Sequence, residues 1–193
     1  MRVFVAGATG VIGMRLVPLL VEAGHEVAGM TRSPAKVEQL CRLAALPIVC
    51  DVFDKAALGE AVGEFAPDVV VSELTDLPDD SAQRAAYAEA NARIRREGTR
   101  NLLDAARAAD ARRFLAQSVA WQLPGEGAAA VEELERITLE AGGVVLRYGR
   151  LYGPCTYYQD ERPEPPRVHV DEAAARTAAL LDAEPGVFTI ADP

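Results

Sequence analysis

The feature that most constrains the fold of this chain is a glycine-rich turn close to its first residue. Val3 to Ala6 form a short apolar run typical of a buried strand, and an apolar helical pattern begins directly after the turn. Amide groups at the start of such a helix can donate to phosphate oxygens, aided by the helix dipole. The G-x-x-G-x-x-G spacing therefore predicts a dinucleotide site, with a glycine-rich turn of an unrelated fold as the alternative. The predicted cofactor-binding residues of the turn are Gly7, Ala8, Thr9, Gly10, Val11, Ile12 and Gly13.

Composition narrows the class of protein. A half-hydrophobic chain of 193 residues suits a single domain over residues 1–193, and a net charge of −9 argues against a nucleic-acid surface. No apolar run reaches the roughly eighteen residues of a membrane span, and the first run is too short for a signal peptide. Cys41, Cys50 and Cys155 are odd in number and widely spaced, which favours reduced thiols in the cytoplasm. No metal-ligand spacing occurs, so we expect no metal site.

Short β-forming runs alternate with helical patterns along the chain. This alternation predicts an α/β fold with a parallel sheet that is covered by helices on both faces. Ligands of such sheets bind at the carboxyl ends of the strands. The expected strands cover residues 3–6, 25–30, 47–50, 68–72, 113–118, 143–147 and 187–190. The expected later helices cover residues 54–63, 81–109, 131–141 and 171–182.

The end of the second expected strand indicates which dinucleotide binds. NAD-binding units commonly carry Asp or Glu there to hold the ribose 2′-hydroxyl, but this strand is followed by Thr31 and Arg32. A guanidinium suits a 2′-phosphate, so Arg32 favours NADP over NAD; a solvated surface arginine is the alternative. Asp51 and Val52 follow the third strand, where a carboxylate can accept from the adenine amino group, although Asp51 could equally cap a helix.

Several blocks of residues then occur in an order that resembles a known family. They are residues 50–54, 67–70, Asn91 with residues 98–103, residues 146–154 and residues 168–171. Together with the glycine turn, they resemble the extended short-chain dehydrogenase/reductase family, the NAD(P)-dependent epimerase/dehydratase-like group. The resemblance implies a Rossmann-type doubly wound sheet with a much reduced C-terminal substrate part, at residues 148–170. It also implies that Ser72 lies beside the cofactor and that Asn91, on the helix that braces the active-site strand, is structural or supports the residues of the active site.

The chain departs from this family in its catalytic residues. The resemblance implies a Tyr-x-x-x-Lys pair, in which the tyrosine is the acid/base and the lysine lowers its pKa. The lysines of this chain are Lys36 and Lys55, and neither follows a tyrosine by four residues. Aligning residues 134–136 with the family's helix places Gly127 and Val131 at the positions of the pair. We therefore expect an unconventional proton donor or no catalysis.

Four residues are candidates for replacing this chemistry. Ser118, near the family's serine position, could bind a substrate oxygen or could merely cap the end of its strand. Tyr148 could donate a proton if Arg147 lowers its pKa, and Tyr152 with Arg150 is a similar pair. Glu73 could be a general acid in a cleft, or it could be solvent-exposed.

The leading hypothesis is an NAD(P)-binding reductase-like or epimerase-like protein that prefers NADP and acts on a small carbonyl, an alcohol or a sugar nucleotide. The alternative is a non-catalytic cofactor-binding protein with a regulatory or interaction role. We also expect a homodimer through the long helix at residues 81–109, a face that relatives often use.

Overall fold

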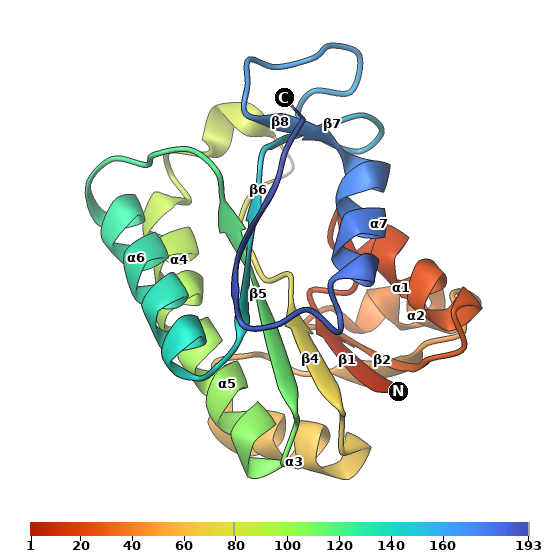
Figure 1. Ribbon diagram of the computed structural model, residues 1–193. Helices are drawn as coiled ribbons and strands as arrows, with labels where there is room; N and C mark the ends of the chain where they lie inside the picture. Colours follow the sequence, from red (N-terminus) through yellow and green to blue (C-terminus); the bar gives the residue numbers. More distant parts are fainter. Residues whose placement is uncertain (79, 193) are drawn as a thin grey trace.

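The computed structural model describes residues 1–78 and 80–192. Its centre is a seven-stranded parallel sheet in the order β3-β2-β1-β4-β5-β6-β9 (Figure 1). The seven strands are β1 (Arg2–Ala6), β2 (Glu26–Thr31), β3 (Leu46–Val49), β4 (Val69–Ser72), β5 (Arg113–Val119), β6 (Val144–Tyr148) and β9 (Gly186–Ile190). The order reverses between β1 and β4, so the carboxyl ends of these two strands mark the topological switch point at which such sheets bind ligands.

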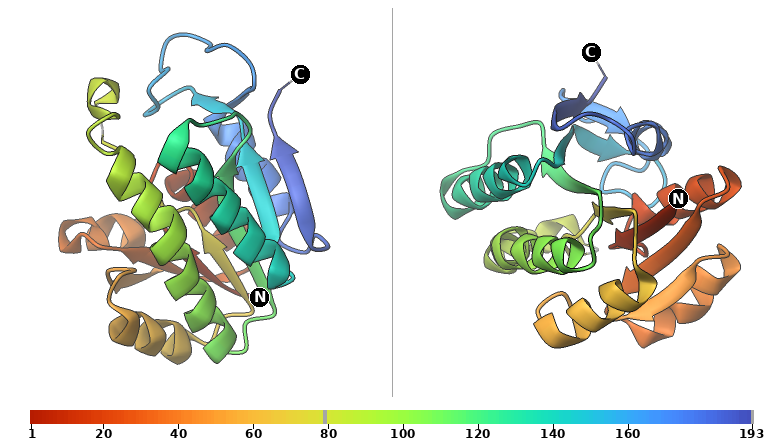
Figure 2. Two further views of the ribbon diagram at one scale, coloured as in Figure 1. Left: turned by 90° about the vertical axis from the view of Figure 1, so that its left-hand side faces the viewer. Right: turned by 60° about the horizontal axis from the view of Figure 1, so that its bottom comes forward.

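Helices cover both faces of the sheet, as the doubly wound pattern predicts. The helices are α1 (Gly13–Glu22), α2 (Val37–Arg42), α3 (Lys55–Phe65), α4 (Ala88–Arg93), α5 (Thr99–Ala108), α6 (Gly125–Glu140) and α7 (Val170–Ala179). Helices α1 and α7 pack side by side on one face, whereas α3, α5 and α6 lie on the other (Figures 1 and 2).

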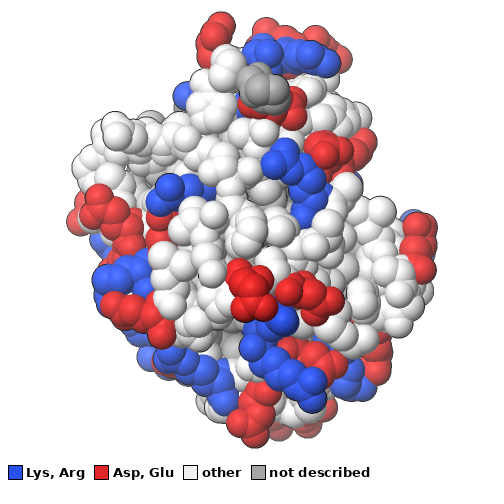
Figure 3. All heavy atoms as spheres, in the orientation of Figure 1, with Lys and Arg blue, Asp and Glu red and all other residues white. Residues whose placement is uncertain are grey.

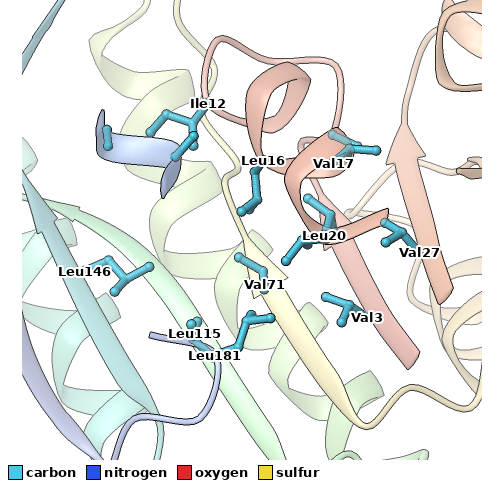
Figure 4. Close-up of a cluster of buried hydrophobic side chains, with 14 of the residues drawn as sticks. Val3, Ile12, Leu16, Val17, Leu20, Val27, Val71, Leu115, Leu146 and Leu181 are labelled. Atoms are coloured by element: carbon cyan, nitrogen blue, oxygen red, sulfur yellow. The ribbon is translucent and has the colours of Figure 1, made fainter. Parts of the chain in front are cut away.

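Two apolar clusters hold these layers together, one on each face. On the α1 and α7 face, Leu16 and Leu20 of α1 point toward Val71 of β4, and Leu146 of β6 belongs to the same cluster (Figure 4). On the opposite face, Leu102 of α5 packs in the second cluster with side chains of β1, β4 and β5. Leu16, Leu102 and Leu146 are fully buried, so both faces exclude water.

The predicted helix at residues 81–109 is wrong over its first third. A short 3₁₀ turn, η2 (Ser81–Gln83), precedes α4, and a π-helical stretch, η3 (Ile94–Gly98), separates α4 from α5. Residues 81–89 are exposed, and the large side chain of Tyr87 among them is 37% exposed. Without a buried face this segment gains no tertiary support for a regular helix, and the core-facing helix begins at α4.

Two other expectations also need correction. Helix α6 begins at Gly125 rather than near Val131, because the Ala128–Ala130 run of strong helix formers adds an N-terminal segment after Pro124. Strands β7 (Arg150–Tyr152) and β8 (Arg167–His169) form a separate two-stranded parallel sheet that the sequence did not predict. The loop at residues 154–166 lies between these two strands in the sequence and extends from them at the top of Figure 1.

Among the described residues, no helix is both long enough and apolar enough to cross a membrane. Positive and negative side chains lie next to one another over the face shown in Figure 3. This mixture of charges fits the ion pairs among the described residues, such as Arg96–Glu126, between η3 and α6, and Arg15–Asp171, between α1 and α7.

Candidate functional site

The glycine-rich turn lies between the end of β1 and the start of α1, at the switch point of the sheet. Gly7 has a φ of +84°, and a Cβ atom there would lie 2.5 Å from the backbone oxygen of Glu73. At Gly13 a Cβ atom would lie 2.4 Å from the backbone oxygen of Gly7. Both contacts are far shorter than carbon and oxygen tolerate, so the turn can close in this form only with glycine at these positions.

The turn presents backbone amides that have no acceptor. Ala8 N–H donates to Met30 and Gly10 N–H to Gly7, so these two amides are already engaged. The amides of Thr9, Val11, Ile12 and Gly13 donate to no group in residues 1–78 and 80–192. The first turn of α1 also carries neither a capping side chain nor an acidic residue. A cluster of unpaired N–H groups at a helix N-terminus fits a diphosphate, as the spacing predicts.

Arg32 lies at the exit of β2 and is held by a residue that the sequence analysis missed. Its Nη2 donates to Asp76 Oδ1 at 2.8 Å, while its side chain stays 62% exposed. This hydrogen bond raises the pKa of Arg32. Thr9 Oγ1 contacts Thr31 Oγ1 at 3.1 Å and so connects the glycine turn to the same strand end. Arg32 is therefore placed beside the turn, but with a carboxylate already against it.

The other predicted cofactor residues occupy the same edge of the sheet. Asp51 is exposed, and its Oδ1 accepts the N–H of Phe53 at 2.9 Å, a local turn that leaves its second oxygen open. Val52 is buried, and its carbonyl accepts from Asn101. Ser72 is buried at the end of β4, next to Ala6 in the sheet register. Their roles in cofactor binding stay predictions.

Glu73 is buried, so the solvent-exposed alternative for this residue is wrong. Its Oε1 contacts Tyr148 Oη at 2.8 Å, Tyr148 Oη contacts Thr177 Oγ1 at 2.5 Å, and Thr177 donates to the carbonyl of Ala173 at 2.8 Å. Three oxygen–oxygen contacts need three hydrogens, and ionised Glu73 leaves only those of Tyr148 and Thr177. Protonated Glu73 supplies the third hydrogen. Burial also raises the pKa of Glu73 to about 8, and Glu73 Oε2 has no hydrogen-bond partner among the residues that the structure describes.

Ser118 and Tyr148, the two candidate catalytic residues, are not brought together. Ser118 is 2% exposed and donates to Glu135 Oε1 on α6 at 2.6 Å. Tyr148 lies on the opposite face of the sheet, among residues of α1 and α7. Burial raises the pKa of Tyr148 well above its usual value, and the adjacent Glu73 raises it further. Both hydroxyls are engaged inside the protein, and a catalytic role for either stays a prediction.

Arg147 does not serve Tyr148 as the sequence hypothesis required. Its Nε and Nη2 donate to the two oxygens of Glu135, at 2.8 and 2.5 Å. Glu135 therefore accepts from both Ser118 and Arg147, which lowers the pKa of Glu135 against its burial. Tyr152 donates to Asp192, and Arg150 lies 5.2 Å from the Trp121 ring. Both members of the second tyrosine–arginine pair thus have partners within the fold, Tyr152 near the C-terminus and Arg150 at the loop before α6.

Sequence reasoning missed Asp76, Glu135 and Arg95. Asp76 and Glu135 act through partners 44 and 12 or more residues away, for which the sequence carries no local signal. Arg95 is a charged residue four positions after Asn91, and Leu102 follows at the helical spacing of a buried face. A charged residue within an apolar helical stripe is a signal that could have singled it out.

Comparison with known proteins agrees with this geometry. Residues 3–137 match the model of the NAD dependent epimerase/dehydratase family. A 3-diazoavenalumate denitrifying reductase of a Streptomyces species is 36% identical over 229 positions, covering 95% of this chain and 73% of the relative. That alignment has more positions than this chain has residues, so the relative contains internal residues that this chain lacks.

Solved structures show the same fold at lower identity. The UDP-glucose 4-epimerase of Thermus thermophilus in complex with NAD has a TM-score of 0.79 at 20% identity, covering 99% of this chain and 78% of that one. The UDP-Glc/GlcNAc 4-epimerase of Campylobacter jejuni has a TM-score of 0.82 at 15% identity, covering 98% and 78%. With the family match over most of its length and the reductase relative, this chain belongs to the NAD dependent epimerase/dehydratase family.

Proposed function

We propose that this chain is an NADP-dependent reductase that acts on a small carbonyl compound. The unpaired amides of Thr9, Val11, Ile12 and Gly13 would hold the diphosphate of the dinucleotide. When bound, the dinucleotide supplies the hydride equivalent for the reaction. The named relatives favour an enzyme, since they include a reductase and a 3-beta-hydroxysteroid dehydrogenase that is 29% identical over 59% of this chain. None of the relatives named above supports a non-catalytic role.

The residues around Arg32 are the reason for proposing NADP rather than NAD. The last residues of β2 are Gly29, Met30 and Thr31, so no carboxylate stands at the position that holds the ribose 2′-hydroxyl in NAD enzymes. Asp76 supplies an anionic oxygen at 2.8 Å from the exposed guanidinium of Arg32. In the proposed complex, a 2′-phosphate takes the place of this carboxylate as the partner of Arg32.

Substitutions in the Arg32–Asp76 pair test this preference. We expect Asp76→Asn to tighten NADPH binding roughly three- to tenfold, because it removes a competing charge, and to leave NADH binding nearly unchanged. Arg32→Glu should weaken NADPH binding by about tenfold or more. Binding is measured by titration of cofactor fluorescence, with Arg42→Glu on α2 as a control of equal charge change. Equal responses of NADPH and NADH would remove the role given to Arg32.

The proton donor of the proposed reaction is unconventional, with Ser118 and Tyr148 as the candidates that the sequence offers. Ser118 donates to Glu135, and Tyr148 is enclosed between Glu73 and Thr177. Residues 148–170, which contain β7 and β8, would form the substrate side of the site. Three unpaired cysteines support a reducing, cytoplasmic location.

The outer face of α4 is our proposed homodimer interface. Residues Ala86, Glu89, Ala90, Arg93, Arg96 and Glu97 line a shallow groove on this face. Sedimentation equilibrium should give twice the 20.6 kDa mass of one chain, and Ala90→Arg should return it to a single mass by placing a bulky charge in the groove. A single mass for the unaltered protein at all concentrations would contradict the dimer.

A further inference from the structure

Arg95 is a buried arginine without a partner. It is 9% exposed, and its guanidinium forms no hydrogen bond or ion pair with any residue that the structure describes. Burial lowers the pKa of Arg95, and no acidic group opposes this effect. An arginine nevertheless stays charged in proteins, and a buried charge without a partner is costly to keep. The guanidinium nitrogens of Arg95 are not among the fully buried polar atoms, so an anion from outside the chain can reach them.

The position of Arg95 is on the sheet-facing side of its helix. It lies four residues after Asn91, whose Oδ1 accepts the N–H of Asp76 in the loop that follows β4. It lies seven residues before Leu102, which packs in the cluster on the sheet. Asn91 and Arg95 are one turn apart, and both are buried together with Ile94, which packs in the same cluster as Leu102. Arg95 therefore lies one turn from a residue that contacts the loop after β4, on the carboxyl side of the sheet.

The neighbouring arginines of the same helix are engaged elsewhere. Arg93 lies 3.9 Å from the centre of the Phe53 ring and donates to Glu97. Arg96 donates to Glu126 of α6 at 2.6 Å. Arg93 and Arg96 thus have partners on the outer sides of the helix. Arg95 differs from them because it lies on the inner face.

Two further donors without acceptors share this place. Ser72 faces the same side of the sheet as Val70, two residues before it, and Val70 packs in the cluster that contains Leu102. The hydroxyl of Ser72 and the Nδ2 group of Asn91 have no hydrogen-bond partner in the described parts of the chain, although both residues are more than 90% buried. A hydroxyl, an amide and a guanidinium thus offer donors at one end of β4, and none of them supplies a negative charge.

We infer that Arg95, with Ser72 and Asn91, binds the carboxylate of the substrate, so that the enzyme reduces a carbonyl compound that also carries a carboxylate. This inference rests on the proposed reductase function. The planar fork of a guanidinium matches the two oxygens of a carboxylate, and the low dielectric around a buried arginine strengthens that contact.

Binding to the NADP⁺-saturated protein tests the inference, because the oxidised cofactor allows no reduction of the probe. The probes are benzoylformate and its neutral methyl ester, compared by isothermal titration. We expect the unaltered protein to bind benzoylformate at least tenfold more tightly than the ester. Arg95→Gln should abolish this preference, Arg95→Lys should keep part of it, and Arg93→Gln is the control. Without ligand, Arg95→Gln should raise the Tm, whereas a purely structural role for Arg95 would lower it.

Two results would overturn the inference. One is the absence of any carboxylate preference in the unaltered protein for benzoylformate, pyruvate and 2-oxoglutarate, measured against their methyl esters. The other is an Arg95→Gln protein that keeps the preference but loses NADP⁺ affinity, which would assign Arg95 to the diphosphate of the cofactor. NADP⁺ affinity is measured separately, so a failed carboxylate preference with intact NADP⁺ binding leaves the proposed function standing.

Discussion

Replacing Glu73 with Gln should remove most of the pH dependence of the free energy of unfolding between about pH 5 and 8. The pKa of Glu73 is about 8 in the folded protein and close to 4.5 in an unfolded chain. The folded state therefore binds more protons in this range. The stabilisation from protonated Glu73 is complete below about pH 4.5 and is lost as the pH rises through 8. The loss is on the order of 1 kcal/mol for each pH unit.

Urea unfolding at a series of pH values measures this effect. Glutamine keeps a neutral side chain that can donate to Tyr148, so Glu73→Gln should be more stable than the unaltered protein at pH 8–9 by a few kcal/mol. Glu64→Gln, on the exposed side of α3, is the matched control and should follow the unaltered protein. Parallel curves for the unaltered protein and Glu73→Gln would show that Glu73 is ionised in the fold.

Gly13→Ala should weaken NADPH binding by at least about tenfold and lower the free energy of unfolding by about 1–3 kcal/mol. The new methyl group would lie 2.4 Å from the backbone oxygen of Gly7 and 2.7 Å from the backbone of Ala8. Because backbone cannot move aside as a flexible side chain does, the turn must open, and the amides of Val11 and Ile12 lose their common direction. Thermal shift with NADPH measures the binding, and urea unfolding measures the stability.

Gly59→Ala provides the control for this substitution. Gly59 lies within α3, and a Cβ atom there meets nothing within 4 Å. Alanine should raise stability there by up to about 1 kcal/mol through its helix propensity, with NADPH affinity unchanged. Unaltered NADPH affinity in Gly13→Ala would contradict the assignment of the turn to the diphosphate.

Local patterns were sufficient to predict the parallel sheet. Apolar β-forming runs such as Val69–Val71 are buried on both faces of the sheet. A continuous run of this kind is typical of a central strand in a parallel sheet. The glycine turn was predictable for the same reason, since its spacing reflects steric demands within seven residues. The prediction of a helix at residues 81–109 was wrong over its first third. Periodicity shows which face of a helix could be buried, but not whether another element packs against that face.

The polar part of the site depends on contacts that no local pattern contains. Glu73 was expected either in a cleft or in solvent, and its burial follows from Tyr148 and Thr177, which lie far along the chain. Arg32 was correctly placed at the edge of the sheet, but Asp76 beside it comes from the loop after β4. Charged side chains are long and can reach several partners, so their pairing is decided only by the assembled fold.

The two edge strands of the sheet, β3 and β9, differ in how well they are protected from pairing with a strand of another molecule. Leu46 and Val49 of β3 are about half exposed, but Pro47 between them has no N–H to offer to an added strand. Strand β9 exposes Val187 and contains no proline. We therefore expect aggregation at high concentration to start at β9, and a lysine in place of Val187 to delay it.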